Sequence, residues 1–268
     1  SSFILVGMSS ISESANIAKS KAFSDSLRNS LLTNLVSEWK LDGNANDSWG
    51  ENNGTLIGPT HFPITKSESE CVLGECYEFD GTEDRISVTN NSNFYMASVF
   101  TIEAWIKPTR LDVSYQGIVT KGMGSYGYHF MTYLSSLRPY MRIGGVWSTA
   151  TANGLDLSLN KWNYVAWTYN GSISKIYVDL KTTSSPRSGE LSYENDDNLE
   201  IGHGKYSPAY FEGLIDNVRI YNQATPTSRI KQNYFLGLNK LYENKGITKI
   251  EYIQILTEFK NNLTKILD

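Results

Sequence analysis

Acidic side chains at three places in the sequence could bind a cation. Asp42 and Asp47 lie at the ends of a loop rich in Asn and Gly, where Asn52 or its neighbour could add an amide oxygen. Asp216 interrupts the apolar run Leu214–Val218, and an acid in such a strand must be paired or coordinated. A hard cation such as Ca²⁺ takes about six to eight oxygen ligands of this kind. In the alternative interpretation, Asp42 forms a turn, Asp47 caps a loop and Asp216 accepts hydrogen bonds from backbone amides.

The two cysteines of the chain, Cys71 and Cys76, enclose a short segment that contains a glycine. The glycine lets the chain turn back so that the sulfurs can meet, and we expect one short-range disulfide bond. A metal site would need two further ligands at matching spacing, and neither a second cysteine pair nor a nearby histidine supplies them. A disulfide favours an oxidising, extracytoplasmic location, and two free cytosolic thiols are the alternative.

The sequence contains no recognisable catalytic arrangement. Glu70, Glu75 and Glu78 lie near the cysteines, but their spacing follows no single strand face, as a glycoside-hydrolysing pair would require. Nucleophile-elbow, phosphate-loop and dinucleotide-binding motifs are absent. The 24 basic and 28 acidic side chains give a net charge of −4, which offers no basic surface for nucleic acid. We therefore expect a protein that is not an enzyme and does not bind nucleic acid.

Aromatic residues are abundant, with 17 Tyr and 6 Trp in 268 residues. Aromatic rings in or beside loops can stack on the flat faces of sugars, while neighbouring polar groups bind the hydroxyls. The alternative assigns each ring to packing or to the rim of the domain. The candidate sugar-binding residues are Tyr126, Tyr128, Tyr140, Trp147, Tyr206 and Tyr210.

The elements that must position these residues are mainly strands. Between about residues 41 and 222, short apolar or alternating runs such as Thr101–Ile106 and Tyr164–Tyr169 are separated by clusters of Gly, Asn, Asp and Ser. Runs of about five residues at spacings near ten predict an antiparallel β-sandwich.

Helical spacing appears at both ends of the chain. From Ser14 to Trp39, apolar residues recur at steps of three and four without Pro or Gly, which predicts one long amphipathic helix. The apolar segment Phe3–Met8 precedes it, and we interpret this start as a cut, with a frayed terminus as the alternative. After Pro226 the spacing predicts a helical hairpin whose second helix is capped by Thr248. No stretch reaches the roughly 18–20 apolar residues of a membrane span.

The middle of the chain resembles the laminin-G-like, concanavalin A-like jelly roll found in many bacterial and archaeal surface proteins. The resemblance departs from the family pattern at Leu180, where the family usually has Gly, so this hairpin turn should differ. It rests on segments in the expected order, namely Leu35–Gly43, Asn46–Leu56, Tyr77–Gly81, Phe100–Pro108, Lys161–Asn170 and Phe211–Asn222.

The resemblance implies a mainly β fold whose closing strand lies next to the first. That neighbourhood would bring Asp42, Asp47, Asn52 and Asp216 together as a structural Ca²⁺ site. The same fold hosts lectins and hydrolases, so the fold by itself does not decide between binding and catalysis.

The two ends resemble a type IV pilin or pseudopilin whose globular head is the jelly roll. This implies three parts, a helix over residues 1–38 with a truncated apolar anchor, a laminin-G-like domain over 39–224 and a helical hairpin over 225–268. In pilins the apolar helix anchors the subunit in the membrane and packs against other subunits in the filament. We therefore expect a cell-surface subunit whose head binds glycans or surface proteins. The alternative is a stand-alone carbohydrate-binding module of a secreted or anchored protein.

Overall fold

The computed structural model describes residues 34–122, 126–149, 155–193, 197–204 and 209–267. The chain divides into two units, Ser1–Leu35 and Val36–Asp268, and the described structure is almost entirely that of the second unit. Most of the N-terminal helix predicted from Ser14 onward therefore lies outside the described residues. Among those described, no helix is both long enough and apolar enough to cross a lipid bilayer.

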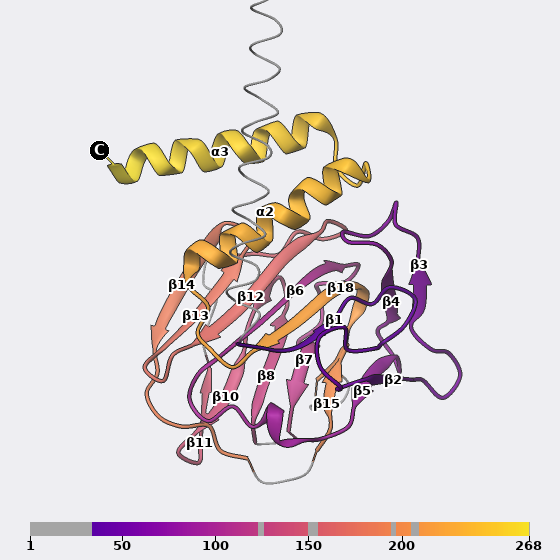
Figure 1. The fold of residues 1–268 in the computed structure, drawn as a ribbon, viewed down its shortest axis with the longest axis vertical. Coiled ribbons are helices and arrows are strands. Elements are labelled where there is room, and N and C mark those ends of the chain that lie inside the picture. The colour runs from indigo at the N-terminus through magenta and orange to yellow at the C-terminus, as the bar shows by residue number, and fades with distance from the viewer. Residues whose placement is uncertain (1–33, 123–125, 150–154, 194–196, 205–208, 268) are drawn as a thin grey trace, which may run out of the picture. The chain divides into compact units, whose positions relative to one another are not determined.

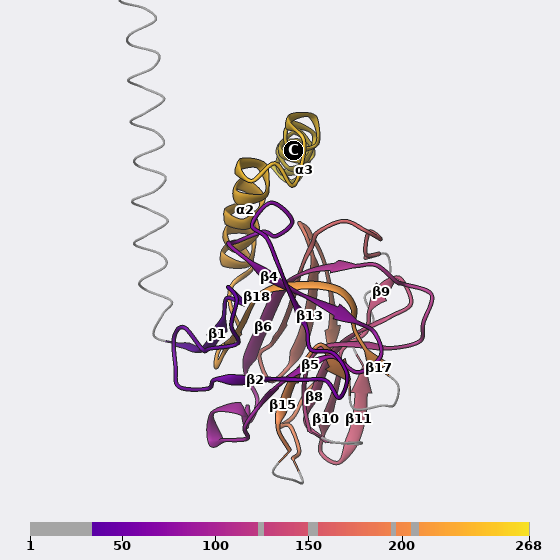
Figure 2. The same ribbon diagram turned by 90° about the vertical axis from the view of Figure 1, so that its right-hand side faces the viewer.

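The core of the fold is a pair of antiparallel sheets packed face to face, as Figures 1 and 2 show. The sandwich predicted from the sequence is therefore present. Sheet A contains, in spatial order, β14 (Lys181–Pro186), β13 (Ile173–Val178), β12 (Asn163–Tyr169), β6 (Phe100–Pro108), β18 (Glu212–Tyr221), β4 (Cys76–Asp80) and β3 (Ile64–Lys66), and β1 (Leu35–Trp39) also pairs with β18.

The second layer, sheet B, carries a small two-stranded sheet beside it, and a short 3₁₀ helix, η2 (Ser92–Phe94), precedes β6. The small sheet is formed by β16 (His203–Gly204) and β17 (Ala209–Tyr210). Sheet B contains, in spatial order, β11 (Val146–Thr149), β10 (Tyr140–Ile143), β8 (Tyr128–Tyr133), β7 (Gln116–Lys121), β15 (Leu199–Ile201), β5 (Arg85–Val88) and β2 (Gly54–Ile57), with β9 (Ser136–Leu137) paired to β8.

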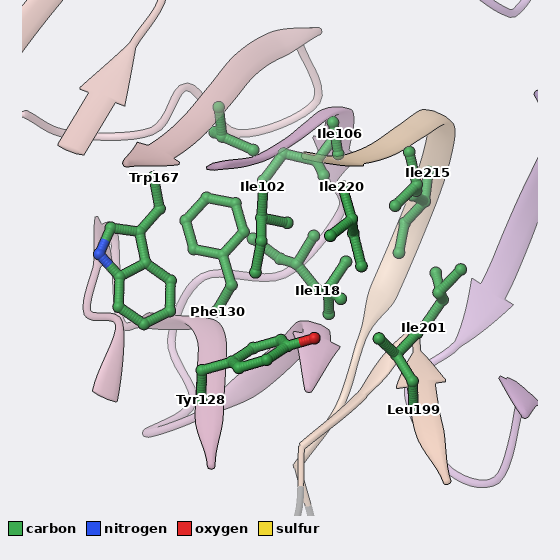
Figure 3. Close-up of a cluster of buried hydrophobic side chains, with 14 of the residues drawn as sticks. Ile102, Ile106, Ile118, Tyr128, Phe130, Trp167, Leu199, Ile201, Ile215 and Ile220 are labelled. Atoms are coloured by element: carbon green, nitrogen blue, oxygen red, sulfur yellow. The ribbon is translucent and has the colours of Figure 1, made fainter. Parts of the chain in front are cut away.

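The inner faces of the two sheets meet in one apolar core (Figure 3). The ring of Phe100 packs edge-on against Trp167 at 4.7 Å between centroids and stacks on Tyr128 at 5.5 Å. Isoleucines from β6, β7, β15 and β18 fill the space beside these rings. Successive side chains of a strand point to opposite faces, so each strand sends every second residue into this core.

The first described strand corrects one expectation from the sequence. The helical spacing that runs to Trp39 predicts helix, yet Leu35–Trp39 forms β1, as the resemblance implied. Trp39 is fully buried in the core, and its indole N–H donates to the backbone oxygen of Asn52 at 2.9 Å. Pairing with β18 gives the backbone of β1 its hydrogen-bond partners, and burial removes the apolar ring of Trp39 from water. These tertiary contacts override the helical spacing of the local sequence.

The predicted helical hairpin is present at the C-terminus. Its helices are α2 (Thr227–Glu243) and α3 (Lys249–Leu267), and α2 lies on the outer face of sheet A (Figure 1). α3 begins with the predicted cap, since the Glu251 N–H donates to the Thr248 hydroxyl at 3.2 Å and the Thr248 N–H donates to the Glu251 carboxylate at 2.9 Å.

A buried carboxylate fastens α2 to sheet A. Glu103 of β6 is fully buried on the outer side of the sheet, and the side-chain amide of Asn233 on α2 donates to both of its oxygens at 2.9 and 3.0 Å. The hydroxyls of Tyr164 and Tyr221 donate to the same carboxylate at 2.6 and 3.1 Å. Burial raises the pKa of both phenols, so they remain protonated donors.

Arg219 extends this network to the first strand. Its guanidinium donates to Glu103 at 3.3 Å and to Glu38 of β1 at 2.6 Å. A β-bulge between Asp216 and Arg219 makes this contact possible, because it shifts the register so that Arg219 lies opposite Glu103.

Gly237 sets the distance between α2 and sheet A. A Cβ at this position would lie 2.5 Å from the ring of Trp105, which stacks on Tyr234 of the same helix. We expect Gly237→Ala to lower the free energy of unfolding, because overpacking of about 1–3 kcal/mol exceeds the gain of about 1 kcal/mol in helix propensity. Urea denaturation measures the change, with Ser228→Ala on the exposed side of α2 as the control. A variant at least as stable as the parent would contradict this packing.

Candidate functional site

A group of partly exposed aromatic side chains lies on the outer side of sheet B. We define the aromatic face as the five residues Tyr115, Tyr126, Tyr133, Tyr140 and Trp147. They come from β8, β10 and β11 and from the residues just before β7 and β8. The strand period of two places the three strand residues, Tyr133, Tyr140 and Trp147, on this side, opposite the residues that enter the core.

The rings of the aromatic face contact one another at right angles or obliquely. Tyr115 lies 5.0 Å from Tyr133 and 6.0 Å from Tyr140 between ring centroids, and the hydroxyls of Tyr115 and Tyr140 are 3.1 Å apart. Trp147 packs edge-on against Tyr140 at 6.0 Å and against the ring of His129 at 5.4 Å. These contacts fix the orientation of the rings before any ligand arrives, which lowers the entropic cost of binding.

Two arginines lie over the rings of this face. The guanidinium carbon of Arg138 is 4.6 Å from the centre of the Tyr133 ring and 5.7 Å from that of Tyr140. Arg142 lies 4.3 Å above Tyr126. A guanidinium supplies several fixed hydrogen-bond donors, and its stacking on an aromatic ring holds it in place. The face therefore combines flat apolar surfaces with oriented donors.

The structure separates the tyrosines and the tryptophan that the sequence suggested as sugar-binding residues. Tyr126, Tyr140 and Trp147 belong to the aromatic face. Tyr210 lies in the small sheet, where its ring stacks on His203 at 4.3 Å. That sheet lies beside β7, because the Thr120 hydroxyl donates to the backbone oxygen of His203 at 2.8 Å. Tyr206 lies outside the described residues.

Tyr128 is directed away from the aromatic face. Its side chain lies among the buried residues of the core (Figure 3) and stacks on Phe100. Tyr126 is partly exposed and Tyr128 is buried, although only one residue separates them. The glycine between them has a positive φ of 77°, so the chain does not keep simple strand alternation here. Tyr128 is therefore a core residue and does not belong to the aromatic face.

Sequence reasoning missed Tyr115, Tyr133, Arg138 and Arg142. Tyr133 alternates along β8 with residues that enter the core, and this pattern is visible in the sequence. The pattern does not tell which outer face of the sandwich is covered by other elements. The arginines carry no local signal, because their position over the rings depends on strand pairing between β8, β9 and β10.

Asp47 is occupied by hydrogen bonds from the backbone. One of its oxygens accepts from the N–H groups of Glu38, Trp49 and Gly50 at 2.9 to 3.0 Å, and the other accepts from Asn52 at 3.2 Å. This is the loop-capping role that the sequence analysis gave as the alternative to metal binding. The side-chain oxygen of Asn52 is also engaged, since it accepts from the amide of Asn91 at 2.7 Å.

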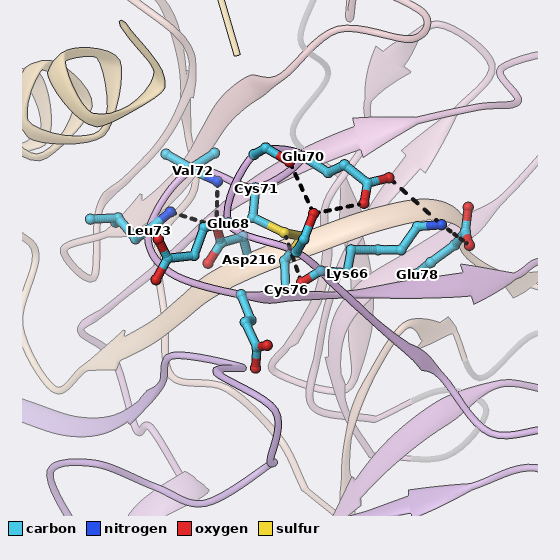
Figure 4. Close-up of a disulfide and its surroundings, with 12 residues drawn as sticks. Lys66, Glu68, Glu70, Cys71, Val72, Leu73, Cys76, Glu78 and Asp216 are labelled. Atoms are coloured by element: carbon cyan, nitrogen blue, oxygen red, sulfur yellow. Dashed lines mark hydrogen bonds and ion pairs between the residues drawn. A yellow bond between two sulfur atoms is a disulfide. The ribbon is translucent and has the colours of Figure 1, made fainter. Parts of the chain in front are cut away.

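Asp216 and Asp42 hold the loop that the disulfide closes. The predicted bond joins Cys71 and Cys76, with their Cα atoms 5.6 Å apart, and Asp216 lies beside it (Figure 4). One oxygen of Asp216 accepts from the N–H groups of the two residues after Cys71 at 2.8 and 2.9 Å. Asp42 accepts from the N–H of Glu75 at 2.8 Å.

The second oxygen of Asp216 is buried and has no hydrogen-bond partner among the described residues. Burial raises the pKa of Asp216 to about 8, although the two loop amides act in the opposite direction, and the negative charge of Asp42 adds to the rise. No group of three or more His, Cys, Asp or Glu side chains in the described part of the chain is placed to hold a metal ion. The calcium site therefore stays a prediction.

We expect the Asp216→Asn variant to gain stability relative to the parent as the pH rises. The native state of the parent binds this proton more tightly than the unfolded state, where the pKa is about 4, so its stabilising contribution is lost between about pH 4 and 8. The asparagine oxygen still accepts both loop amides and does not titrate. Melting temperatures of both proteins at pH 5, 6, 7 and 8, without metal, measure the difference.

A constant difference across this pH range would contradict the raised pKa of Asp216. The same series with added Ca²⁺ serves as the test of the calcium prediction, because an ion that binds only the native state raises its melting temperature. A rise for the parent that is absent in Asp216→Asn would support a calcium site at this carboxylate.

The two antiparallel layers define the fold as a jelly-roll β-sandwich. A family model described as the concanavalin A-like lectin/glucanases superfamily, of the laminin-G type, matches residues 80–231, more than half of the chain. The chain belongs to this family, which confirms the resemblance seen in the sequence. No curated protein sequence matches the chain.

Solved structures with the same fold include a domain in complex with a carbohydrate and the binding domain of a toxin. Domain 4 of AbnA, a GH43 extracellular arabinanase from Geobacillus stearothermophilus in complex with arabinotriose, is 15% identical, with a TM-score of 0.64 over 74% of this chain and 97% of that one. The binding domain of Paraclostridial Mosquitocidal Protein 1 is 18% identical, with a TM-score of 0.61 over 78% of this chain and 53% of that one.

A third structure is of botulinum neurotoxin type C, whose cell entry depends on interaction with two ganglioside molecules. It is 12% identical, with a TM-score of 0.59 over 78% of this chain and 53% of that one. The chain thus spans about half the length of the two toxin structures. At these identities the similarity shows the fold.

Proposed function

We propose that this chain is a non-catalytic, extracellular glycan-binding domain whose ligand lies across the aromatic face. The observation that carries the proposal is the set of partly exposed rings on the outer side of sheet B, held by contacts among themselves and overlaid by Arg138 and Arg142. Sugar rings present flat C–H surfaces that stack on aromatic rings, and their hydroxyls accept hydrogen bonds from guanidinium groups. The face provides both kinds of contact.

Two further observations support this proposal. The AbnA domain with the same fold was solved with arabinotriose, and the neurotoxin structure concerns ganglioside interaction. Both ligands are glycans or carry them. The disulfide bond between Cys71 and Cys76 is consistent with an oxidising location outside the cytoplasm.

We expect Trp147→Ala to weaken glycan binding by about 30-fold or more, because truncating an aromatic residue that anchors a ligand costs about 2 kcal/mol or more. The measurement is binding to a glycan array, followed by titration calorimetry with the best ligand. Trp49→Ala is the matched control, because Trp49 is 45% exposed in the loop between β1 and β2 and lies outside the aromatic face.

Equal loss of binding in Trp147→Ala and Trp49→Ala would place the ligand elsewhere. A parent protein that binds no glycan on the array would count against glycan binding as the function. Unchanged melting temperatures of both variants show that a loss of binding is not a loss of fold.

We further propose that the segment before β1 carries the domain as a pilin-like subunit. The support is the apolar segment Phe3–Met8 followed by helical spacing in the sequence. In this arrangement the helix packs against other subunits and the head is displayed for adhesion. The rival is a carbohydrate-binding module attached to another protein.

Immunogold labelling of the producing cells with an antibody against the head separates these two arrangements. A pilin-like subunit predicts gold particles along surface filaments. Label confined to the cell envelope or to secreted material would support the separate binding module. Cells that lack the gene are the control for antibody specificity.

A further inference from the structure

A cavity lies beneath the helical hairpin, on the opposite side of the sandwich from the aromatic face. It has a volume of about 610 Å³ and is lined by the outer face of sheet A, the loop before β12 and the two helices. We define the hairpin cavity by six of its lining residues, namely Trp105, Trp162, Asp179, Tyr234, Gln254 and Phe259. Its volume lies within the range of about 300–1,000 Å³ that is typical of small-ligand sites.

Two polar groups of the hairpin cavity have hydrogen-bonding capacity that the described residues do not use. Asp179 accepts from the backbone N–H of Tyr164 at 2.9 Å through one oxygen, and the other oxygen makes no hydrogen bond. Tyr234 is only 4% exposed, yet its hydroxyl also makes no hydrogen bond within the described part of the chain. Tyr234 is buried and Asp179 is partly exposed, so a ligand that enters the cavity could use this capacity.

The two groups are close enough to interact electrostatically. Burial raises the pKa of Asp179 to about 6, and burial together with the charge of Asp179 raises the pKa of Tyr234. At neutral pH the lining of the cavity therefore offers a carboxylate that accepts hydrogen bonds and a phenol that donates one. A ligand with several hydroxyls, each of them donor and acceptor at once, can use both groups.

Aromatic rings border the same space. Trp105 stacks on Tyr234 with 5.7 Å between ring centroids and 17° between ring planes. Trp162 is partly exposed, and its indole N–H is already engaged by the backbone oxygen of Glu70 at 3.0 Å, so it offers the cavity ring surface. Phe259 contributes a further partly exposed ring from α3.

The charges around the hairpin cavity balance. The lining contains three lysines, at 107, 161 and 181, and three carboxylates, at 179, 251 and 258. Lys161 and Glu251 form an ion pair at 3.7 Å, and the Gln254 amide donates to Glu258 at 3.1 Å. A balanced lining gives no advantage to an ionic ligand, and the combination of rings with unpaired donors and acceptors favours a neutral polyhydroxylated one.

We propose that the hairpin cavity is a second saccharide-binding site, which takes a short neutral saccharide between sheet A and α3. The choice of a saccharide rests on the proposed function, and the location rests on Asp179, Tyr234 and the surrounding rings. The protein then binds glycan on both outer sides of the sandwich. The helical hairpin has a role of its own in this arrangement, because α3 covers the bound sugar.

Hydrogen exchange with mass spectrometry locates the two sites separately. The probes are the neutral trisaccharides arabinotriose, maltotriose and cellotriose at millimolar concentration. We expect at least one of them to slow exchange in the turn around Asp179 and in α3. Binding at the aromatic face instead slows exchange in residues 126–149.

Tyr234→Phe and Asp179→Asn test the chemistry of the hairpin cavity. Each variant should lower the apparent affinity for the saccharide, measured from protection at the cavity, about fivefold to tenfold, since each removes one hydrogen bond to the ligand. Both variants should have the melting temperature of the parent, because the Tyr234 hydroxyl makes no hydrogen bond to the described residues. Asparagine at 179 keeps the bond from Tyr164 and tolerates the positive φ of 54°. Tyr242→Phe, on a partly exposed tyrosine of the same helix outside the cavity, is the matched control.

The outcomes distinguish this inference from the proposed function. Protection limited to residues 126–149, or protection of α3 that is unchanged in Tyr234→Phe, overturns the second site and leaves the aromatic face intact. Protection at the cavity that persists in Trp147→Ala supports the second site even if the aromatic face binds nothing. No protection by any of the three trisaccharides overturns it.

Discussion

The arrangement of strands and helices depends most on the hydrogen bonds to the buried carboxylate of Glu103. A charge buried between sheet A and α2 requires donors, and here they come from β12, β18 and α2, with Arg219 reaching on to Glu38 of β1. Glu103 therefore couples β6 to β12, β18 and α2, and Arg219 extends the network to β1. Loss of one donor leaves the remaining charge poorly compensated, so the network specifies this arrangement more strongly than a purely apolar contact would.

The sandwich uses its surfaces in three different ways. The inner faces form the apolar core, and the outer face of sheet A is largely covered by α2, which sits close because Gly237 has no side chain. The outer face of sheet B keeps its rings partly exposed. The same strand period of two produces all three surfaces, and the position of the helical hairpin decides which outer face is left open for a large ligand.

Several features could be predicted because their causes are local. The disulfide, the capped hairpin helix and the strand runs all follow from spacing over a few residues. The sequence also predicted a different hairpin turn at Leu180, where the family usually has glycine. In the structure the positive φ of this turn is at Asp179, one position earlier. The failures involve longer distances. Leu35–Trp39 is a strand because β18 is available to pair with it, and Asp216 binds the backbone of the disulfide loop because the fold brings that loop, from a distant part of the sequence, against β18.

The sequence by itself determined the class of fold, the order of its elements, the disulfide and the abundance of aromatic residues, because periodicity, turn residues and short spacings act within a few residues along the chain. Only the tertiary structure decided which rings gather into the aromatic face, that Tyr128 belongs to the core, and that Asp42, Asp47 and Asp216 serve backbone amides. Those outcomes depend on strand register and on which face of each sheet is covered. Both are set by contacts between residues more than a hundred positions apart, such as Glu103 with Asn233.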